Sequence, residues 1–164
     1  MKSQRARAKI NLTLHVGRVI TDLSDAFYGY HPLDSLVVFA DIGDEIEMAE
    51  ADKTTLSIEG PFAEGLTAQD DNLILRALTA AKAKPHKITL QKHLPVSAGI
   101  GGGSANAAAV LRMCGVDDLQ TAVSLGADVP VCLHSKTAHM TGIGEDVTLM
   151  PGMGQLQALL INPR

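Results

Sequence analysis

Residues 95–112 read "PVSAGIGGGSANAAAVLR" and place four glycines within five positions, directly before a run of small helix-forming residues. Glycine loses more conformational freedom on folding than any other residue, so such a cluster indicates positive φ angles or close approach of a ligand. The stretch "KITLQKHLP" before it predicts a strand, and the stretch after it predicts a helix that begins near Ser104. A strand, a loop of small residues and a helix N-terminus together predict an anion site, of which phosphate is the commonest occupant. The alternative is a flexible turn capped by Ser104.

Two common glycine motifs are excluded by the residues themselves. A Walker loop requires a lysine after the glycines, and the chain has Ser104, Ala105 and Asn106 there. A dinucleotide-binding fingerprint fits at Gly99 and Gly101 but has Ser104 where its last glycine belongs. The loop is therefore a candidate phosphate cradle of another kind.

Two charged residues could do chemistry beside such a loop. Asp128 lies between Ala127 and Val129 in an otherwise apolar stretch, where a solvated carboxylate is out of place, so it is a candidate general base. The alternative is a helix cap or turn before Pro130. Lys9 belongs to the polar face of a predicted strand, and its position alone favours a solvent-facing side chain.

Strands and helices must position these residues. Residues 8–17 alternate with period two, which predicts a strand that buries Ile10, Leu12, Leu14 and Val16. A polar loop at 18–32 follows and presents Tyr30 and His31. Strands or extended segments are predicted at 33–42 and 44–50 (separated by Gly43), 54–60, 87–95, 128–133, 136–143, 145–150 and 155–162. Helices are predicted at 70–83 (capped by Asp70, Asp71 or Asn72), 104–113 and 117–125. Consecutive strands with helices inserted favour an α+β fold over a doubly wound sheet.

The composition narrows the class of protein. The chain has 164 residues, of which 46% are hydrophobic and 20% charged, as in a globular domain with a sizeable core. A net charge of −4 without a basic stripe argues against a nucleic-acid partner, and no apolar run has the length of a membrane span. Two cysteines without metal-site spacing predict reduced thiols in a cytoplasmic protein.

The stretch "PVSAGIGGGSANAA" resembles the second motif of the GHMP kinases, the family of galactokinase and of homoserine, mevalonate and phosphomevalonate kinases. Three other stretches resemble the same family in the same order: "ARAKINLTLHV" (6–16), "GYHPLDSLV" (29–37) and "LGADVPVCL" (125–133). The resemblance covers nearly the whole chain. It implies the GHMP N-terminal domain, which is ribosomal protein S5 domain 2-like: an α+β fold with helices packed on a mixed sheet.

The resemblance also implies an activity. Together with "GYH", the triple glycine is most similar to the branch of the family that uses ATP and Mg²⁺ to phosphorylate a hydroxyl of 4-diphosphocytidyl-2-C-methyl-D-erythritol, on the non-mevalonate route to isoprenoids. The expected partner is then a small cytidine-diphosphate-linked polyol, with no nucleic acid and no membrane. Two alternatives stay open: another GHMP alcohol kinase of the homoserine or mevalonate type, and a non-catalytic nucleotide-binding module.

Roles for individual residues follow from the resemblance. It implies that Asp128 and Lys9 are the catalytic pair, that Asn11 and His31 contact the substrate, and that Tyr30 stacks on the cytosine ring. It implies that Asn72 lies near the adenine end of ATP, although helix capping explains that residue equally well. No metal ligand is implied. The expected ATP-binding loop consists of Pro95, Val96, Ser97, Ala98, Gly99, Ile100, Gly101, Gly102, Gly103 and Ser104.

The chain departs from the family pattern in two places that matter for function. Ala105 stands where relatives often have a serine, so one hydroxyl near the phosphates is missing. The chain ends with "INPR", where relatives continue into a second domain. We therefore expect residues 1–164 to form the N-terminal ATP-binding and catalytic domain, without the C-terminal domain.

Overall fold

One long strand organises the computed structural model, which describes residues 1–161. This strand, β3, runs over 18 residues and belongs to a seven-stranded mixed sheet. The strands are β1 (Lys2–Asn11), β2 (His15–Val16), β3 (Leu33–Glu50), β4 (Thr55–Glu59), β5 (His86–Gln91), β6 (Ala138–Thr141) and β7 (Asp146–Leu149). The helices are α1 (Leu73–Ala80), α2 (Gly102–Met113), α3 (Leu119–Leu125) and α4 (Val129–His134).

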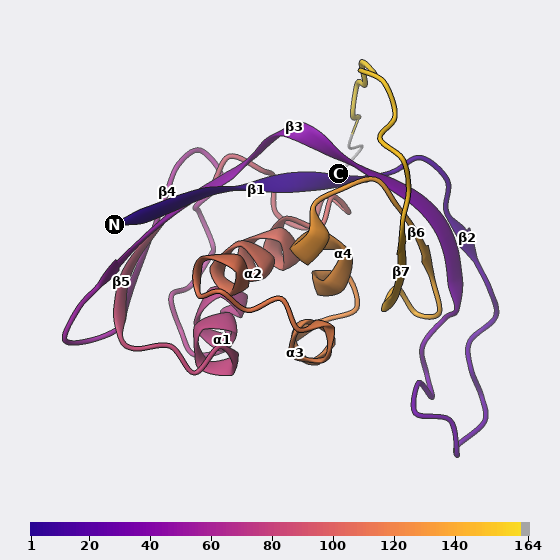
Figure 1. Cartoon of the computed structure of the whole chain (residues 1–164), viewed down its shortest axis with the longest axis horizontal. Coiled ribbons are helices and arrows are strands. Elements are labelled where there is room, and N and C mark those ends of the chain that lie inside the picture. The colour runs from indigo at the N-terminus through magenta and orange to yellow at the C-terminus, as the bar shows by residue number, and fades with distance from the viewer. Residues whose placement is uncertain (162–164) are drawn as a thin grey trace.

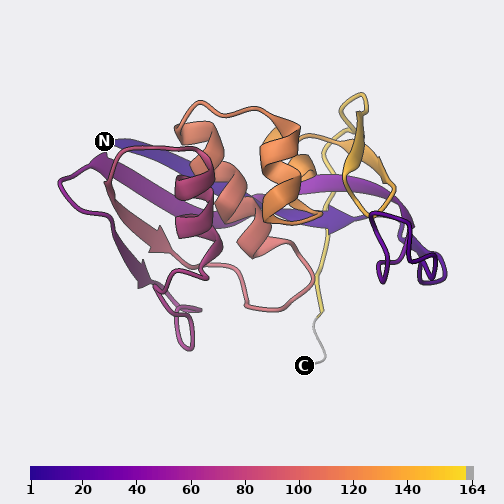
Figure 2. The same cartoon turned by 90° about the horizontal axis from the view of Figure 1, so that it is seen from below.

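The sheet has the order β4-β5-β3-β6-β7, and β1 and β2 also pair with β3. Among the strand pairs of residues 1–161, β4–β5 is parallel and the others are antiparallel. The sheet arches over the helices, all of which lie on its concave side (Figure 1). Viewed from below, α2 lies across the middle of the sheet with α1 beside it (Figure 2). The predicted α+β fold is therefore confirmed.

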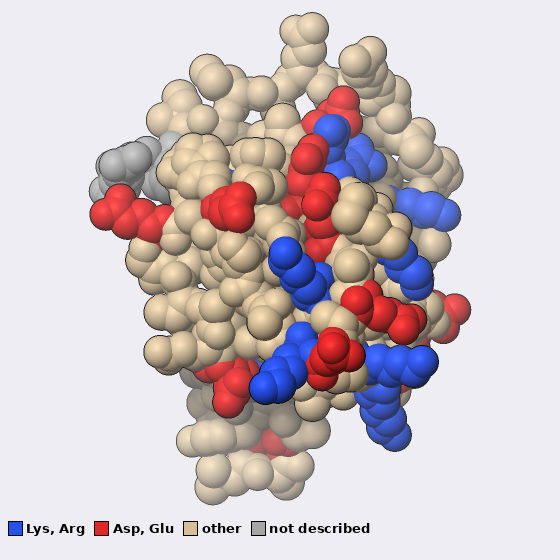
Figure 3. Space-filling model, turned by 90° about the vertical axis from the view of Figure 1, so that its left-hand side faces the viewer, with Lys and Arg blue, Asp and Glu red and all other residues tan. Residues whose placement is uncertain are grey.

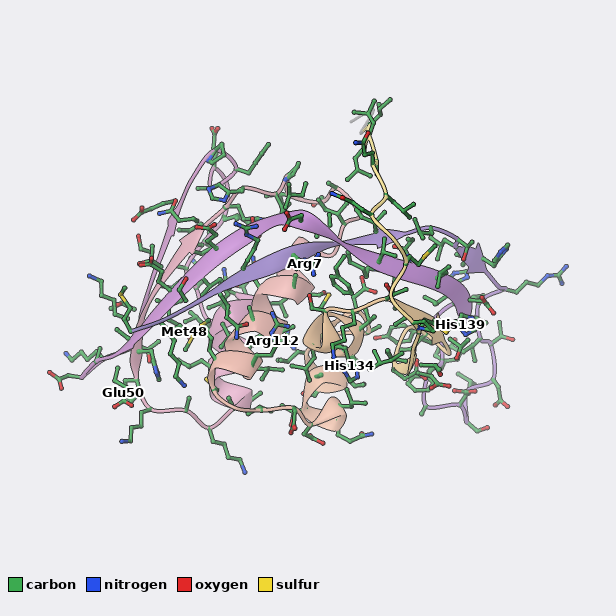
Figure 4. The ribbon with its side chains drawn as sticks, turned by 45° about the horizontal axis from the view of Figure 1, so that its top comes forward. Arg7, Met48, Glu50, Arg112, His134 and His139 are labelled. Carbon is green, nitrogen blue, oxygen red and sulfur yellow. The ribbon has the colours of Figure 1, made fainter. Side chains whose placement is uncertain are left out.

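The core lies between the sheet and α2. Alanines make up half of the buried residues of this helix, so its backbone can lie close to β1 and to α1. In the last turn of α2, Arg112 points toward α4 (Figure 4). Its Nη1 donates to the carbonyl oxygen of Cys132 over 2.6 Å. This bond satisfies a carbonyl in the last turn of α4 that the helix itself leaves unpaired. Arg112 therefore fixes α4 against α2.

The first strand differs from its prediction. It begins at Lys2 and ends at Asn11, and Leu12, Leu14 and Val16 are exposed instead of buried. The reason is a register shift between Arg7 and Lys9, which breaks the alternation of the strand. As a result both Ala8 and Lys9 are buried.

The predicted break at Gly43 is also wrong, because β3 continues through this residue. A Cβ atom at Gly43 would lie only 2.3 Å from the carbonyl oxygen of Ala6 on β1. The glycine is therefore required for the close approach of two strands and not for a turn.

Three further segments depart from the sequence-based expectation. The predicted strand at 128–133 is the helix α4, whose first turn contains Pro130. Residues 155–161 form no strand, and Asn162 lies outside the described residues. The helix expected to begin near Ser104 begins at Gly102. By contrast, β4, β6, β7, α1 and α3 confirm their predictions within a few residues, while β5 ends earlier than expected.

The surface shows charges of both signs. On the face shown in Figure 3, lysine and arginine side chains are interspersed with aspartate and glutamate. Within residues 1–161, no helix has the length and hydropathy needed to cross a membrane.

Candidate functional site

The glycine loop is folded as a cradle with free donors. Ser97, Gly99 and Gly101 all have positive φ angles, and Gly101 is the N-cap of α2 with φ of 65°. Alternating backbone handedness of this kind turns successive N–H groups toward a common side. Within the described residues, none of the backbone N–H groups of 99–104 donates a hydrogen bond. The first turn of α2 thus offers unpaired donors at the positive end of the helix.

A cavity of about 360 Å³ lies beside this loop, within the size range of small-ligand sites. The expected residues 95–104 and Asn72 all line it. Leu66, Leu73, Ile74 and Leu90 form its apolar walls. Asn72 is also the N-cap of α1, because its Oδ1 accepts from the N–H of Ile74 over 3.0 Å. The capping explanation of Asn72 is thus correct, and the residue borders the cavity as well.

The structure brings Lys9 and Asp128 together from opposite ends of the chain. Lys9 Nζ donates to Asp128 Oδ1 over 3.1 Å and to Asn11 Oδ1 over 3.2 Å. The Lys9 side chain is 5% exposed and that of Asp128 is 36% exposed, so the lysine is not the solvent-facing strand residue that its position alone favours. Asp128 Oδ2 accepts no hydrogen bond from the described residues and stays available to a ligand.

The pair borders the glycine loop directly. A Cβ atom at Gly101 would lie 3.3 Å from Lys9 Cβ and 3.9 Å from Asp128 Oδ2. The backbone N–H of Lys9 also donates to the carbonyl oxygen of Ile100 over 2.9 Å. Lys9 also pairs with Phe39 of β3, so at this residue β1 contacts both the long strand and the glycine loop.

Asn11 links this pair to β3 and to the chain just after β1. Its Nδ2 donates to Ser35 Oγ over 2.6 Å, and Ser35 Oγ donates in turn to the carbonyl oxygen of Thr13 over 2.6 Å. Tyr30 and His31 lie on the loop at 17–32, between β2 and β3, and do not line the cavity. Tyr30 is 54% exposed, and His31 Nδ1 lies 2.9 Å from the carbonyl oxygen of Gly17.

A second ion pair, which the sequence analysis missed, holds the entrance to the glycine loop. Asp44 is fully buried, and its Oδ2 accepts from Lys92 Nζ over 2.6 Å. Its Oδ1 accepts from the N–H groups of His93 and Leu94, each over 2.8 Å. A Cβ atom at Gly102 would lie 3.2 Å from Lys92 Nζ, so this pair supports the start of α2. In the sequence, the sign of this ion pair is a lysine, Lys92, three residues before the loop begins at Pro95.

Comparison with known proteins agrees with this geometry. Residues 72–136, which include the glycine loop and Asp128, match the family model described as "GHMP kinases N terminal domain". The 4-diphosphocytidyl-2-C-methyl-D-erythritol kinase of Paracoccus denitrificans is 50% identical over 99% of the chain. The chain is therefore similar to the N-terminal domain of the GHMP kinases. The kinase of the same name from Ruegeria pomeroyi is 49% identical over 97% of the chain.

Solved structures of such kinases share the fold of this chain. A crystal structure of 4-(cytidine 5'-diphospho)-2C-methyl-D-erythritol kinase superposes with a TM-score of 0.70 at 33% identity, over 91% of this chain and 55% of that one. A mevalonate kinase shares the fold with a TM-score of 0.53 at 13% identity, over 93% of this chain and 57% of that one. The chain spans 56% of the length of the Paracoccus kinase and 57% of the Ruegeria kinase.

Proposed function

We propose that this domain is the nucleotide-binding and catalytic part of a kinase that transfers a phosphoryl group from ATP to a hydroxyl of 4-diphosphocytidyl-2-C-methyl-D-erythritol. The observation that carries the proposal is the contact of Lys9 with Asp128 beside Gly101, at the start of α2. Phosphoryl transfer requires a phosphate cradle, a cation and a group that directs the substrate hydroxyl. Relatives about 50% identical over this chain are named as kinases of that compound.

The residues of the cavity fit ATP. The free N–H groups of 99–104 suit phosphate oxygens, and nothing in the chain lies within 4 Å of the missing Cβ atom of Gly99. The apolar walls formed by Leu73, Ile74 and Leu90 suit a purine. Bound ATP would supply the phosphoryl group, and a Mg²⁺ ion carried on its phosphates would offset their charge. Within residues 1–161, no three His, Cys, Asp or Glu side chains gather as a metal site of their own.

Each member of the pair has a chemical task in this proposal. Asp128 Oδ2 accepts the proton of the substrate hydroxyl or orients that hydroxyl toward the phosphoryl group. Lys9 holds the Asp128 carboxylate through Oδ1 and places positive charge where negative charge develops. Asn11 fixes the Lys9 ammonium group from the other side. The cytidine part of the substrate is assigned to Tyr30 and His31.

A phosphoryl-transfer assay with three alcohols tests the proposed function: 4-diphosphocytidyl-2-C-methyl-D-erythritol, mevalonate and homoserine. We expect transfer to the cytidine-bearing alcohol. Transfer only to mevalonate or homoserine would instead assign another GHMP activity. ATP binding without transfer to any of them would identify a nucleotide-binding module and refute the kinase.

Asp128→Asn tests the catalytic role. The substitution preserves the shape of the side chain but removes its basic oxygen, so kcat should fall by about 10²- to 10⁴-fold. ATP affinity, measured by calorimetry, should change little. The double variant Asp128→Asn with Lys9→Met should lose far less than the sum of the single losses, because the two side chains act as one unit. Additive losses would contradict the paired mechanism.

A further inference from the structure

Asn106 carries a buried polar atom that the folded chain leaves without a partner. The residue lies on α2 and is 4% exposed. Its Oδ1 is the one buried side-chain nitrogen or oxygen among residues 1–161 that has no hydrogen bond. Buried polar groups are almost always paired, because an unpaired one retains the full cost of its desolvation. An exception of this kind calls for a partner that the chain itself does not provide.

The position of Asn106 shows where that partner would lie. The residue lines the cavity beside the glycine loop. It follows Gly102 by four residues, so both face the same side of α2, and Gly102 faces Lys92 and Leu94. Asn106 thus lies about one helical turn after the free N–H donors at the start of α2. It lines the same cavity as the apolar residues Leu73, Ile74 and Leu90.

The chemistry of the carboxamide narrows the choice of partner. Phosphate oxygens only accept hydrogen bonds, so they cannot satisfy Oδ1. An asparagine side chain offers an acceptor and a donor side by side, which is the pattern that pairs with the exocyclic amine and N7 of adenine. Guanine presents two acceptors at the same edge and would leave Oδ1 unpaired.

We propose that the Asn106 carboxamide binds the edge of the adenine base and selects ATP over GTP. The proposal rests on the proposed function, since it requires nucleotide in this cavity. The acceptor of Asn106 receives the exocyclic amine, its donor binds a ring nitrogen, and Leu73, Ile74 and Leu90 enclose the ring. Asn106 is therefore a specificity-determining residue, distinct from the phosphate loop and from the catalytic pair.

Asn106→Leu tests this with two measurements that should move in opposite directions. Leucine has the same branched arrangement of heavy atoms as asparagine and removes the unpaired atom, so the melting temperature without ligand should rise by about 2–4 °C. Affinity for the non-hydrolysable analogue AMP-PNP, measured by calorimetry, should fall by about 10- to 100-fold. The preference for AMP-PNP over GMP-PNP should disappear. Ser104→Ala is the matched control: a lost phosphate contact should weaken both analogues equally and leave their ratio unchanged.

The possible results separate this proposal from the one it rests on. If the unmodified protein binds neither analogue, the proposed function itself is wrong. If it prefers AMP-PNP and Asn106→Leu preserves that preference, the role of Asn106 is overturned. A lower melting temperature without ligand would show that the side chain serves the fold and would also overturn it. Asn106→Asp replaces the donor while preserving the shape, and it should weaken AMP-PNP binding even if the leucine variant does not fold.

Discussion

Lys9 connects three parts of the candidate site. Its ammonium group bonds to Asp128 and Asn11, and its backbone N–H bonds to the glycine loop. One residue therefore joins β1, α4 and the loop before α2. A change at any of these contacts should alter the other two, which is why the proposed catalytic pair cannot be treated as two independent groups.

At the same scale, Tyr30 is expected to select the substrate and not to take part in the chemistry. The residue is about half exposed on the 17–32 loop and does not line the cavity beside the glycine loop. Tyr30→Ala should raise the KM for the cytidine-bearing alcohol more than it lowers kcat, because the ring contributes binding that is equal in ground and transition states.

Tyr30→Phe retains the ring and serves as the control for this prediction. It should change the KM by less than about threefold, since stacking depends on the ring face and not on the hydroxyl. An unchanged KM in Tyr30→Ala would remove Tyr30 from the substrate site.

At the scale of elements, the close approach of β1 to β3 depends on one missing side chain. Gly43→Ala should destabilise the protein by about 1–3 kcal/mol or more, because the new Cβ would meet Ala6 at 2.3 Å and force the strands apart. Urea denaturation measures this change. Gly152→Ala, where nothing lies within 4 Å of the added atom, should leave the stability unchanged within about 0.5 kcal/mol. Equal effects of the two substitutions would show that the contact at Gly43 does not constrain the sheet.

The elements also show which features a sequence pattern can predict. The helical spacing of residues 73–78 and the cap at Asn72 are local properties, and α1 follows them. The segment 128–133 is a short apolar run, whose pattern fits a buried strand and a buried helix alike. Its packing against α2 decides for the helix. The burial of Lys9 depends on a register shift against β3, and a period of two within one strand contains no information about that shift.

In the candidate site too, some residues could be predicted from the sequence and others could not. The glycine loop, Lys9 and Asp128 could be selected by residue type and family resemblance, and the structure brings them together. Asp44 and Asn106 could not be selected in this way, because their importance comes from their burial. Asp44 gains its partners only where β3 meets the end of β5, and Asn106 differs from its alanine neighbours only through the cavity that it faces.

At the scale of the whole molecule, one thiol should reduce the stability in alkali. Burial, together with the negative charge of Asp128, raises the pKa of Cys132 to about 12 from an ordinary value near 9. Between these values the unfolded chain releases a proton that the folded chain retains, so the free energy of unfolding decreases as the pH rises. Between pH 8 and pH 10 this thiol should remove about 1.4 kcal/mol of stability.

Cys132→Ala isolates that contribution, because the other groups that titrate in alkali are the same in both proteins. Denaturation curves at pH 8, 9 and 10 should show a shallower loss of stability in the variant, whatever its stability at pH 8. Parallel losses in the two proteins would contradict an alkaline effect of the buried thiol.

The contact between Lys9 and Asp128 spans 119 positions of the chain, and this has a consequence for synthesis on the ribosome. At typical elongation rates, Lys9 is added to the chain roughly 6 to 24 seconds before Asp128. The nascent strand β1 can pair with β3 during this interval, but the lysine has no carboxylate to bind. A polypeptide that stalls before residue 128 can therefore assemble much of the sheet and still present an incomplete site. The proposed catalytic pair is complete only when translation has passed Asp128.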